Sequence, residues 1–173
     1  MIISSTYKRG TSTESLWIRV CVSTQSLDLL QGGEILRCYS ISTALRGVGC
    51  EYGSHCTPLG THRVKVKIGT GCPFGAVFER RRYTGQIYSP EGALDAQSRD
   101  LILSRILWLE GVEKGVNKNG HVDTLRRYIY IHGTSEENLI GKPTSHGCIR
   151  MKNSEIIELF EIAPVGIMVL IVR

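Results

Sequence analysis

Two short segments near the end of the chain contain residue types that can do covalent chemistry. Residues 145–148 (SHGC) place a cysteine directly after a glycine, and residues 132–134 (HGT) supply a histidine. A free cysteine has a pKa of about 8.5, and its thiolate is the species that attacks a carbonyl. A histidine within hydrogen-bond reach accepts that proton near neutral pH. The pattern predicts that Cys148 is a nucleophile with His132 as its base, and that its thiol reacts well below about pH 8.

Gly147, directly before the cysteine, has a separate predicted role. A residue without a Cβ lets the backbone turn sharply and lets a substrate carbonyl approach the main chain. The amides of Gly147 and Cys148 are then predicted to point at a developing oxyanion.

Simpler interpretations exist for the same residues. An isolated cysteine is most often a small buried hydrophobe, and His132 follows an apolar run, where a strand-end histidine with a backbone partner is common. Zinc is another alternative, with ligands drawn from His132, His146, Cys148, His55, Cys56, His62 and Cys72. No Cys-x-x-Cys pair and no His-x-x-x-His spacing occurs in the chain. We therefore predict a nucleophile, with no metal and no cofactor.

Several further segments resemble one known family. Residues 132–134 (HGT), 140–143 (IGKP) and 145–151 (SHGCIRM) resemble the signature of the L,D-transpeptidase catalytic domain, the YkuD family. Residues 57–60 (TPLG) resemble the Thr-Pro-x-Gly turn of that family, and residues 166–172 resemble its closing strand. The resemblance covers nearly the whole chain and implies one catalytic domain over residues 1–173.

The resemblance also implies roles for individual residues. Cys148 matches the nucleophile of the family, His132 its general base, and Gly133 the position whose carbonyl orients that base. Residues 146–148 match the segment whose amides form the oxyanion hole, and Arg150 matches the residue that braces it. The catalytic candidates are Cys148, His132, His146, Gly133 and Gly147. The substrate-binding candidates are Arg150, Ser145, Tyr130 and Arg81.

The substrate implied by the resemblance is a peptidoglycan tetrapeptide stem or a muropeptide of a bacterium. Members of the family attack the carbonyl of the L-centred third residue, commonly meso-diaminopimelate, and release the terminal D-alanine. If water resolves the thioester, the enzyme is an L,D-carboxypeptidase. If the amine of another stem resolves it, the enzyme is an L,D-transpeptidase that forms 3-3 cross-links.

Charge and composition are compatible with such a substrate. The net charge of +5, from 21 basic and 16 acidic residues, favours anionic partners. The basic residues are scattered and few aromatic residues are interleaved, so no nucleic-acid partner is expected. Residues 80–82 (RRR) and 126–127 (RR) are exceptions. A solvated face is the simplest interpretation of both clusters. The planar fork of arginine also suits a substrate carboxylate, and at least one arginine of residues 80–82 is expected to bind one, with Arg81 as the candidate.

The N-terminus and the cysteines bear on location. Residues 1–10 (MIISSTYKRG) lack the long apolar stretch of a secretory signal. No segment approaches the ~18 apolar residues of a membrane span. Without Cys148, an odd number of cysteines remains, which suits reduced thiols better than a disulfide framework. We expect a cytoplasmic enzyme of muropeptide recycling, hence a carboxypeptidase, or an enzyme of the cell envelope if a signal was removed. The oligomeric state stays open.

The elements that position these residues are mostly strands. Residues 16–22 and 63–68 alternate apolar and polar side chains, which indicates half-buried strands. Gly32 and Gly33 predict a tight hairpin between strands at 27–30 and 35–41, and short apolar runs at 128–131 and 167–172 predict buried strands. Helices are predicted over 98–110, and from Asn153 up to Pro164. The predicted fold is mainly β, a sandwich of two mixed sheets with peripheral helices, as in the family that the chain resembles.

Overall fold

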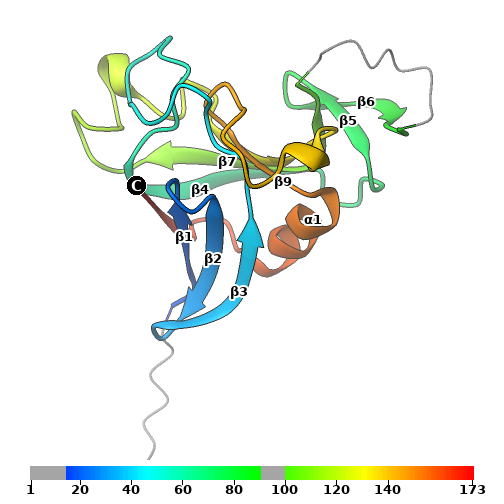
Figure 1. Ribbon diagram of the computed structural model, residues 1–173, viewed down its shortest axis with the longest axis horizontal. Coiled ribbons are helices and arrows are strands. Elements are labelled where there is room, and N and C mark those ends of the chain that lie inside the picture. Colours follow the sequence, from blue (N-terminus) through cyan, green and yellow to red (C-terminus); the bar gives the residue numbers. More distant parts are fainter. Residues whose placement is uncertain (1–14, 91–99) are drawn as a thin grey trace, which may run out of the picture.

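The computed structural model describes residues 15–90 and 100–173 (Figure 1). The described residues form strands β1 Trp17–Cys21, β2 Ser26–Gln31, β3 Glu34–Ser40, β4 Gly60–Ile68, β5 Ala76–Glu79, β6 Arg82–Ile87, β7 Ile102–Gly111, β8 Tyr130–Gly133, β9 Ile149–Met151 and β10 Met168–Val172, the helix α1 Asn153–Ile162, and the short 3₁₀ turns Gly120–Val122 and Glu137–Leu139. The predicted mainly β class is therefore confirmed.

The strands are joined by hydrogen bonds in the order β3-β2-β1-β10-β4-β7-β5-β6. β7 is the branch point, because it also pairs with β8, which in turn pairs with β9. β1–β10 and β8–β9 are parallel and the other pairs are antiparallel, so the sheet is mixed as predicted. The two predicted sheets are thus continuous with each other through shared strands.

The strands with the clearest sequence patterns form where they were predicted. β1 alternates buried Ile18 and Val20 with half-buried neighbours. β2 and β3 pair antiparallel around Gly32 and Gly33, whose φ angles of 61° and 80° suit a tight hairpin turn. β10 matches the closing apolar run.

The helix predicted over 98–110 is wrong. Residues 102–111 form β7, and Ser98 lies outside the described residues. Residues 103–107 are all buried, because apolar clusters cover both faces of this strand, so its sequence does not alternate. A bulge between Leu103 and Ile106, with Ser104 at φ 63°, shifts the pattern further. The resulting apolar spacing imitates that of a helix.

The predicted alternation of β4 is also only partly right. Val64 is buried, but Val66 is exposed, since a register shift lies between the two residues. Strands β5, β6 and β9 were not predicted, because they are short or have exposed polar sequences. The strand predicted at 128–131 begins later, as Tyr128 has a φ of 57°.

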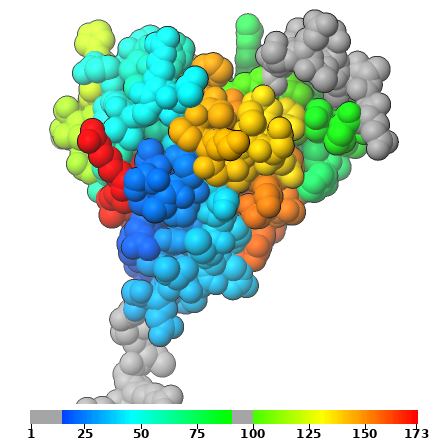
Figure 2. All heavy atoms as spheres, viewed as in Figure 1, coloured from blue at the N-terminus to red at the C-terminus, as the bar shows by residue number. Residues whose placement is uncertain are grey.

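Alternation in β8 and β9 sends their side chains to two different clusters. Ile131, Ile149 and Met151 point into the larger core, which also contains Ile156 and Phe160 of α1. Tyr130 and Cys148 belong to a smaller cluster on the other face. The predicted second helix is confirmed: α1 ends before Pro164 and packs on β7 and β8 (Figure 1). In Figure 2, the segment that leads into β9 lies at the surface, coloured yellow to orange.

Candidate active site

The pairing of β8 with β9 brings the predicted nucleophile and base onto one face. These strands are parallel, with His132 opposite Arg150, and Cys148 immediately precedes β9. The Tyr130 N–H donates to Cys148 Sγ at 3.4 Å, and the thiol donates to the Tyr128 carbonyl at 3.5 Å. Side chains two residues apart in a strand share a face. Cys148 and His132 therefore lie on the same face of the β8–β9 strand pair, away from the larger core.

His132 is held by its own strand in one tautomer. Its side chain is 1% exposed, and its Nδ1 lies 2.8 Å from the Gly133 carbonyl oxygen. A carbonyl only accepts, so Nδ1 carries the proton and Nε2 keeps a lone pair. Burial lowers the pKa of His132, although the negative charge of Asp100 and the Gly133 carbonyl oppose this shift. The imidazole is consequently a neutral base at pH 7.

The thiol of Cys148 is protonated at neutral pH. Burial raises its pKa to about 12, and the hydrogen bond from the Tyr130 amide offsets this only in part. The negative charge of Asp100 raises the pKa as well, while Arg150 and Arg127 lower it. This shift is opposite in direction to the one that a thiol reacting well below pH 8 requires, and labelling of Cys148 over a pH series tests that expectation.

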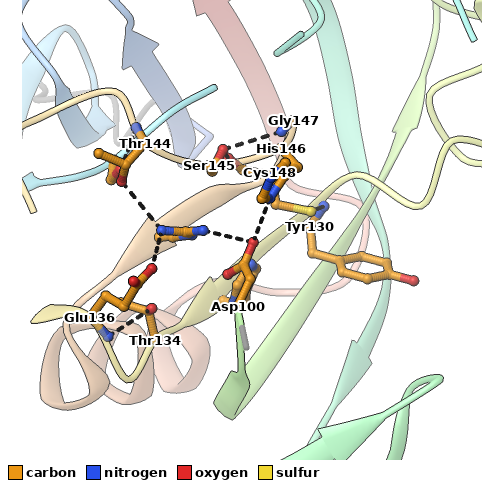
Figure 3. Close-up of polar contacts among 12 residues, drawn as sticks. Asp100, Tyr130, Thr134, Glu136, Thr144, Ser145, His146, Gly147 and Cys148 are labelled. Carbon is orange, nitrogen blue, oxygen red and sulfur yellow. Dashed lines mark hydrogen bonds and ion pairs between the residues drawn. The ribbon is translucent and has the colours of Figure 1, made fainter. Parts of the chain in front are cut away.

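The turn before Cys148 is fastened by side-chain hydrogen bonds. Ser145 Oγ donates to the Cys148 carbonyl at 2.6 Å and accepts from the Gly147 amide at 3.2 Å (Figure 3). Thr57 Oγ1 donates to the Gly147 carbonyl at 3.0 Å, which explains the motif at 57–60. The Gly147 amide was predicted to point at an oxyanion. It instead donates to Ser145 within the turn. Ser145, 1% exposed, holds the turn and is not placed to bind substrate.

Both glycines of the site are required by their surroundings. Gly147 has a φ of 131°, and a Cβ there would lie 3.2 Å from Ile129 Cδ1. A Cβ on Gly133 would come within 2.4 Å of Asn153 Oδ1 and 2.7 Å of the Leu103 carbonyl. The backbone of β8 at Gly133 therefore packs directly against β7 and α1.

Arg150 braces the site from inside. It is 2% exposed, and its guanidinium pairs with Asp100 at 2.7 Å and with Glu136 at 2.8 Å. A third contact, 3.3 Å long, goes to Thr144 Oγ1. The prediction that Arg150 binds substrate does not fit this burial, whereas its bracing role does. Asp100 and Glu136 were missed, because no local pattern links them to an arginine far along the chain.

His146 lies at the mouth of the site. Its side chain is 73% exposed, and its Nδ1 is 3.4 Å from Asp100 Oδ2 (Figure 3). His146 also makes an edge contact with His55 at a centroid distance of 6.2 Å. His146 also lines a pocket together with Tyr128, the residue whose carbonyl accepts from the Cys148 thiol. The pocket is lined by Tyr52, Gly53, His55, Arg127, Tyr128, Ile129 and His146.

Tyr130 and Arg81, both predicted near substrate, are brought together. The Arg81 guanidinium donates to the Tyr130 hydroxyl at 3.4 Å. It also lies over the rings of Trp108 and Tyr128, at 5.0 and 4.8 Å from their centroids. Tyr130 is buried, with 4% of its side chain exposed.

The zinc alternative has no support in the described part of the chain. Residues 15–90 and 100–173 contain no group of three or more histidine, cysteine or acidic side chains that could hold a metal ion. His62 is buried elsewhere, with its ring nitrogens at the Gly60 carbonyl and Thr124 Oγ1. Across the same residues, no helix is long and apolar enough to cross a membrane.

Comparisons with known proteins bear on the family of the chain. A sequence model of the L,D-transpeptidase catalytic domain, YkuD, matches residues 15–171. The protein YqjB of Bacillus subtilis is 56% identical over 41 residues, which are 24% of this chain and 23% of YqjB. YkuD of Bacillus subtilis is 48% identical over 48 residues, 28% of this chain and 29% of YkuD. The matched segments thus span only about a quarter of these relatives.

Solved structures share the fold. The L,D-transpeptidase of Xylanimonas cellulosilytica has a TM-score of 0.54 and 18% identity, over 94% of this chain and 63% of that chain. L,D-transpeptidase 3 from Mycobacterium tuberculosis, in complex with a faropenem-derived adduct, has a TM-score of 0.56 and 13% identity, over 92% and 61%. With the sequence match over residues 15–171, the chain belongs to the YkuD family of L,D-transpeptidase catalytic domains.

Proposed function

We propose that this chain is a cysteine acyltransferase that acts on peptidoglycan stem peptides, with residues 15–171 as its catalytic domain. The observation that carries the proposal is the pair of Cys148 and His132 on one face of β8 and β9, with His132 Nδ1 fixed on the Gly133 carbonyl. Family membership supports the substrate class.

The first half-reaction forms a thioester. His132 Nε2 takes the thiol proton as Cys148 Sγ attacks the carbonyl carbon of the L-centred third residue. The C–S bond forms and the C–N bond to the terminal D-alanine breaks. The proton on His132 then passes to the nitrogen of the leaving D-alanine, which departs with an uncharged amino group.

Burial of both partners shapes this step. Because the thiol pKa is about 12 and the imidazole is neutral, a standing thiolate–imidazolium pair is not populated at rest. Proton transfer accompanies attack, and the developing oxyanion needs preorganised donors. Since Ser145 engages the Gly147 amide, we assign the oxyanion to the amides of His146 and Cys148.

The second half-reaction distinguishes two enzymes. Hydrolysis of the thioester yields a tripeptide and defines an L,D-carboxypeptidase, which remains our leading prediction. Transfer to an amine defines an L,D-transpeptidase, the alternative.

The test is incubation of the purified chain with a soluble disaccharide-tetrapeptide, with and without an amine acceptor. We expect release of D-alanine and accumulation of the tripeptide when no acceptor is added. Dimers or amine adducts as the only products would establish transfer. The Cys148→Ala variant is the control for both outcomes and is expected to release no D-alanine.

A further inference from the structure

Arg81 occupies a three-ring aromatic site on the face of the sheet that carries Cys148. Its guanidinium lies 5.0 Å from the centroid of Trp108 and 4.8 Å from that of Tyr128, and it donates to the Tyr130 hydroxyl at 3.4 Å. The rings also support one another: Trp108 contacts Tyr128 at 5.8 Å and Tyr130 at 5.7 Å. Such stacking fixes the plane of the guanidinium.

The backbone holds this arrangement in unfavourable conformations. Arg80 and Arg81 form the two-residue turn between β5 and β6, with φ angles of 46° and 68°. Asparagine and glycine are the usual residues of such a turn. Tyr128 also has a positive φ, 57°. Strained non-glycine residues cluster where function requires a particular side chain.

The charge of Arg81 has no counterion among the residues that the structure describes. Among the other arginines that are at least half-buried, Arg19, Arg63 and Arg150 each pair with a carboxylate. Arg105 and Arg127, which lack such a pair, donate instead to backbone carbonyls. The hydrogen bond of Arg81 to a neutral hydroxyl leaves most of its fork of donors available for an anion.

The same two tyrosines connect this cation to the nucleophile. The backbone amide of Tyr130 donates to Cys148 Sγ, and the carbonyl of Tyr128 accepts from it. The sulfur therefore lies between the main chains of the two residues whose side chains hold Arg81.

From this geometry we infer that Arg81 is a specificity-determining residue that binds a carboxylate of the stem peptide while the acyl group is attacked by Cys148. The inference rests on the proposed function. Two carboxylates of the stem offer the required chemistry: that of the terminal D-alanine and that on the side chain of the third residue. A guanidinium held flat by aromatic rings favours bidentate binding of either one.

The experiment compares the full chain with Arg81→Gln and Arg82→Gln, using the free stem tetrapeptide and two derivatives, each with one of those carboxylates amidated. Arg82 is exposed in the same hairpin, so its variant controls for the change in net charge. We expect Arg81→Gln to raise KM for the free stem about tenfold with kcat nearly unchanged, as for loss of a charged hydrogen bond. Arg82→Gln is expected to leave KM unchanged.

The amidated stems identify the carboxylate. Amidation at the recognised position raises KM for the unmodified chain by a similar factor but adds no further loss in Arg81→Gln. Arg81→Lys keeps the charge without the planar fork, and its KM is expected to lie between those of the unmodified chain and Arg81→Gln. This variant replaces Arg81→Gln in the test if the glutamine variant does not fold.

Two results overturn the inference. The first is equal KM values for Arg81→Gln and Arg82→Gln. The second is an unmodified chain that accepts both amidated stems as well as the free one. Intact mass separates this failure from that of the proposed function: acylation of Cys148 with no dependence on Arg81 refutes only the carboxylate role, whereas no acylation by any stem refutes both.

Discussion

At Cys148, burial opposes the charge that a nucleophilic sulfur needs. The pKa of its thiol is raised to about 12, and that of its neighbour His132 is lowered, both mainly by burial. Each group is therefore neutral at pH 7. In the proposed mechanism, proton transfer to His132 accompanies the attack of the sulfur on a carbonyl.

A first prediction concerns alkylation of two cysteines in one protein. The pKa of Cys21 is lowered to about 7, chiefly by hydrogen bonding with Ser23, so it ionises near neutral pH. Iodoacetamide should label Cys21 with a rate that levels off above about pH 8, whereas the rate at Cys148 keeps rising beyond about pH 10. Peptide mapping by mass spectrometry over a pH series measures both rates. Equal labelling at pH 7 would contradict a buried, protonated Cys148.

A second prediction uses Asp100. Burial acts to raise its pKa, but the hydrogen bond from Arg150, the interaction with His132 and the charge of Arg150 together lower it. The carboxylate in turn raises the pKa of His132. In Asp100→Asn that support is lost, so the acid limb of the kcat/KM profile, which reports protonation of the free base, should move to lower pH. An unmoved limb, or a shift to higher pH, would exclude this coupling.

Among the elements, β7 shows where sequence patterns are insufficient. At its bulge, the Ser104 hydroxyl donates to Asn153 Oδ1 at 2.6 Å and accepts from the Gly75 amide at 3.0 Å. Asn153, the first residue of α1, donates through its side-chain amide to the Thr134 carbonyl and to Glu137. Local periodicity does not reveal such contacts, because they join segments that are distant in the chain. The hairpin at Gly32 and Gly33 was predictable since its turn and alternation are local.

The packing of β8 against α1 and β7 gives a third prediction. Gly133→Ala would drive a Cβ against Asn153 Oδ1 and the Leu103 carbonyl, and overpacking of this kind costs about 1–3 kcal/mol. Chemical denaturation should show this loss, together with a larger loss of activity because His132 is displaced. Gly49→Ala is the control: a Cβ there meets only the Cys56 side chain, at 3.2 and 3.5 Å, and should cost less. Equal stability of the two variants would refute the packing argument.

At the scale of the whole molecule, His62 links folding to pH. Burial lowers its pKa from 6.5 to about 4, against the opposing effect of its bond to the Gly60 carbonyl. Between these pH values, His62 takes up a proton in the unfolded chain but not in the folded chain. The free energy of unfolding therefore falls as the pH drops from about 6.5 towards 4. The loss is on the order of 3 kcal/mol. Unfolding free energies at several pH values should fall more steeply for the unmodified chain than for His62→Gln; parallel curves would disprove the assignment.

The mainly β class and the segments of the site could be predicted from the sequence, because both depend on local spacing and on the match at 132–151. The assembly of the site could not. The pairing of Arg150 with Asp100 and Glu136, and the rings around Arg81, depend on how β7, β8 and the β5–β6 turn meet in space. The protonation states of Cys148 and His132 follow from the same assembly.

The most direct test of the central proposal is the intact mass of the protein after brief exposure to a stem tetrapeptide. A gain equal to the acyl tripeptide, mapped to Cys148, removed by hydroxylamine and absent from Cys148→Ala, is the predicted result, with slower gain in His132→Ala. Cys72→Ala, which removes another half-buried thiol, should behave as the unmodified chain. Release of D-alanine by Cys148→Ala, or an adduct on a different residue, would contradict the account.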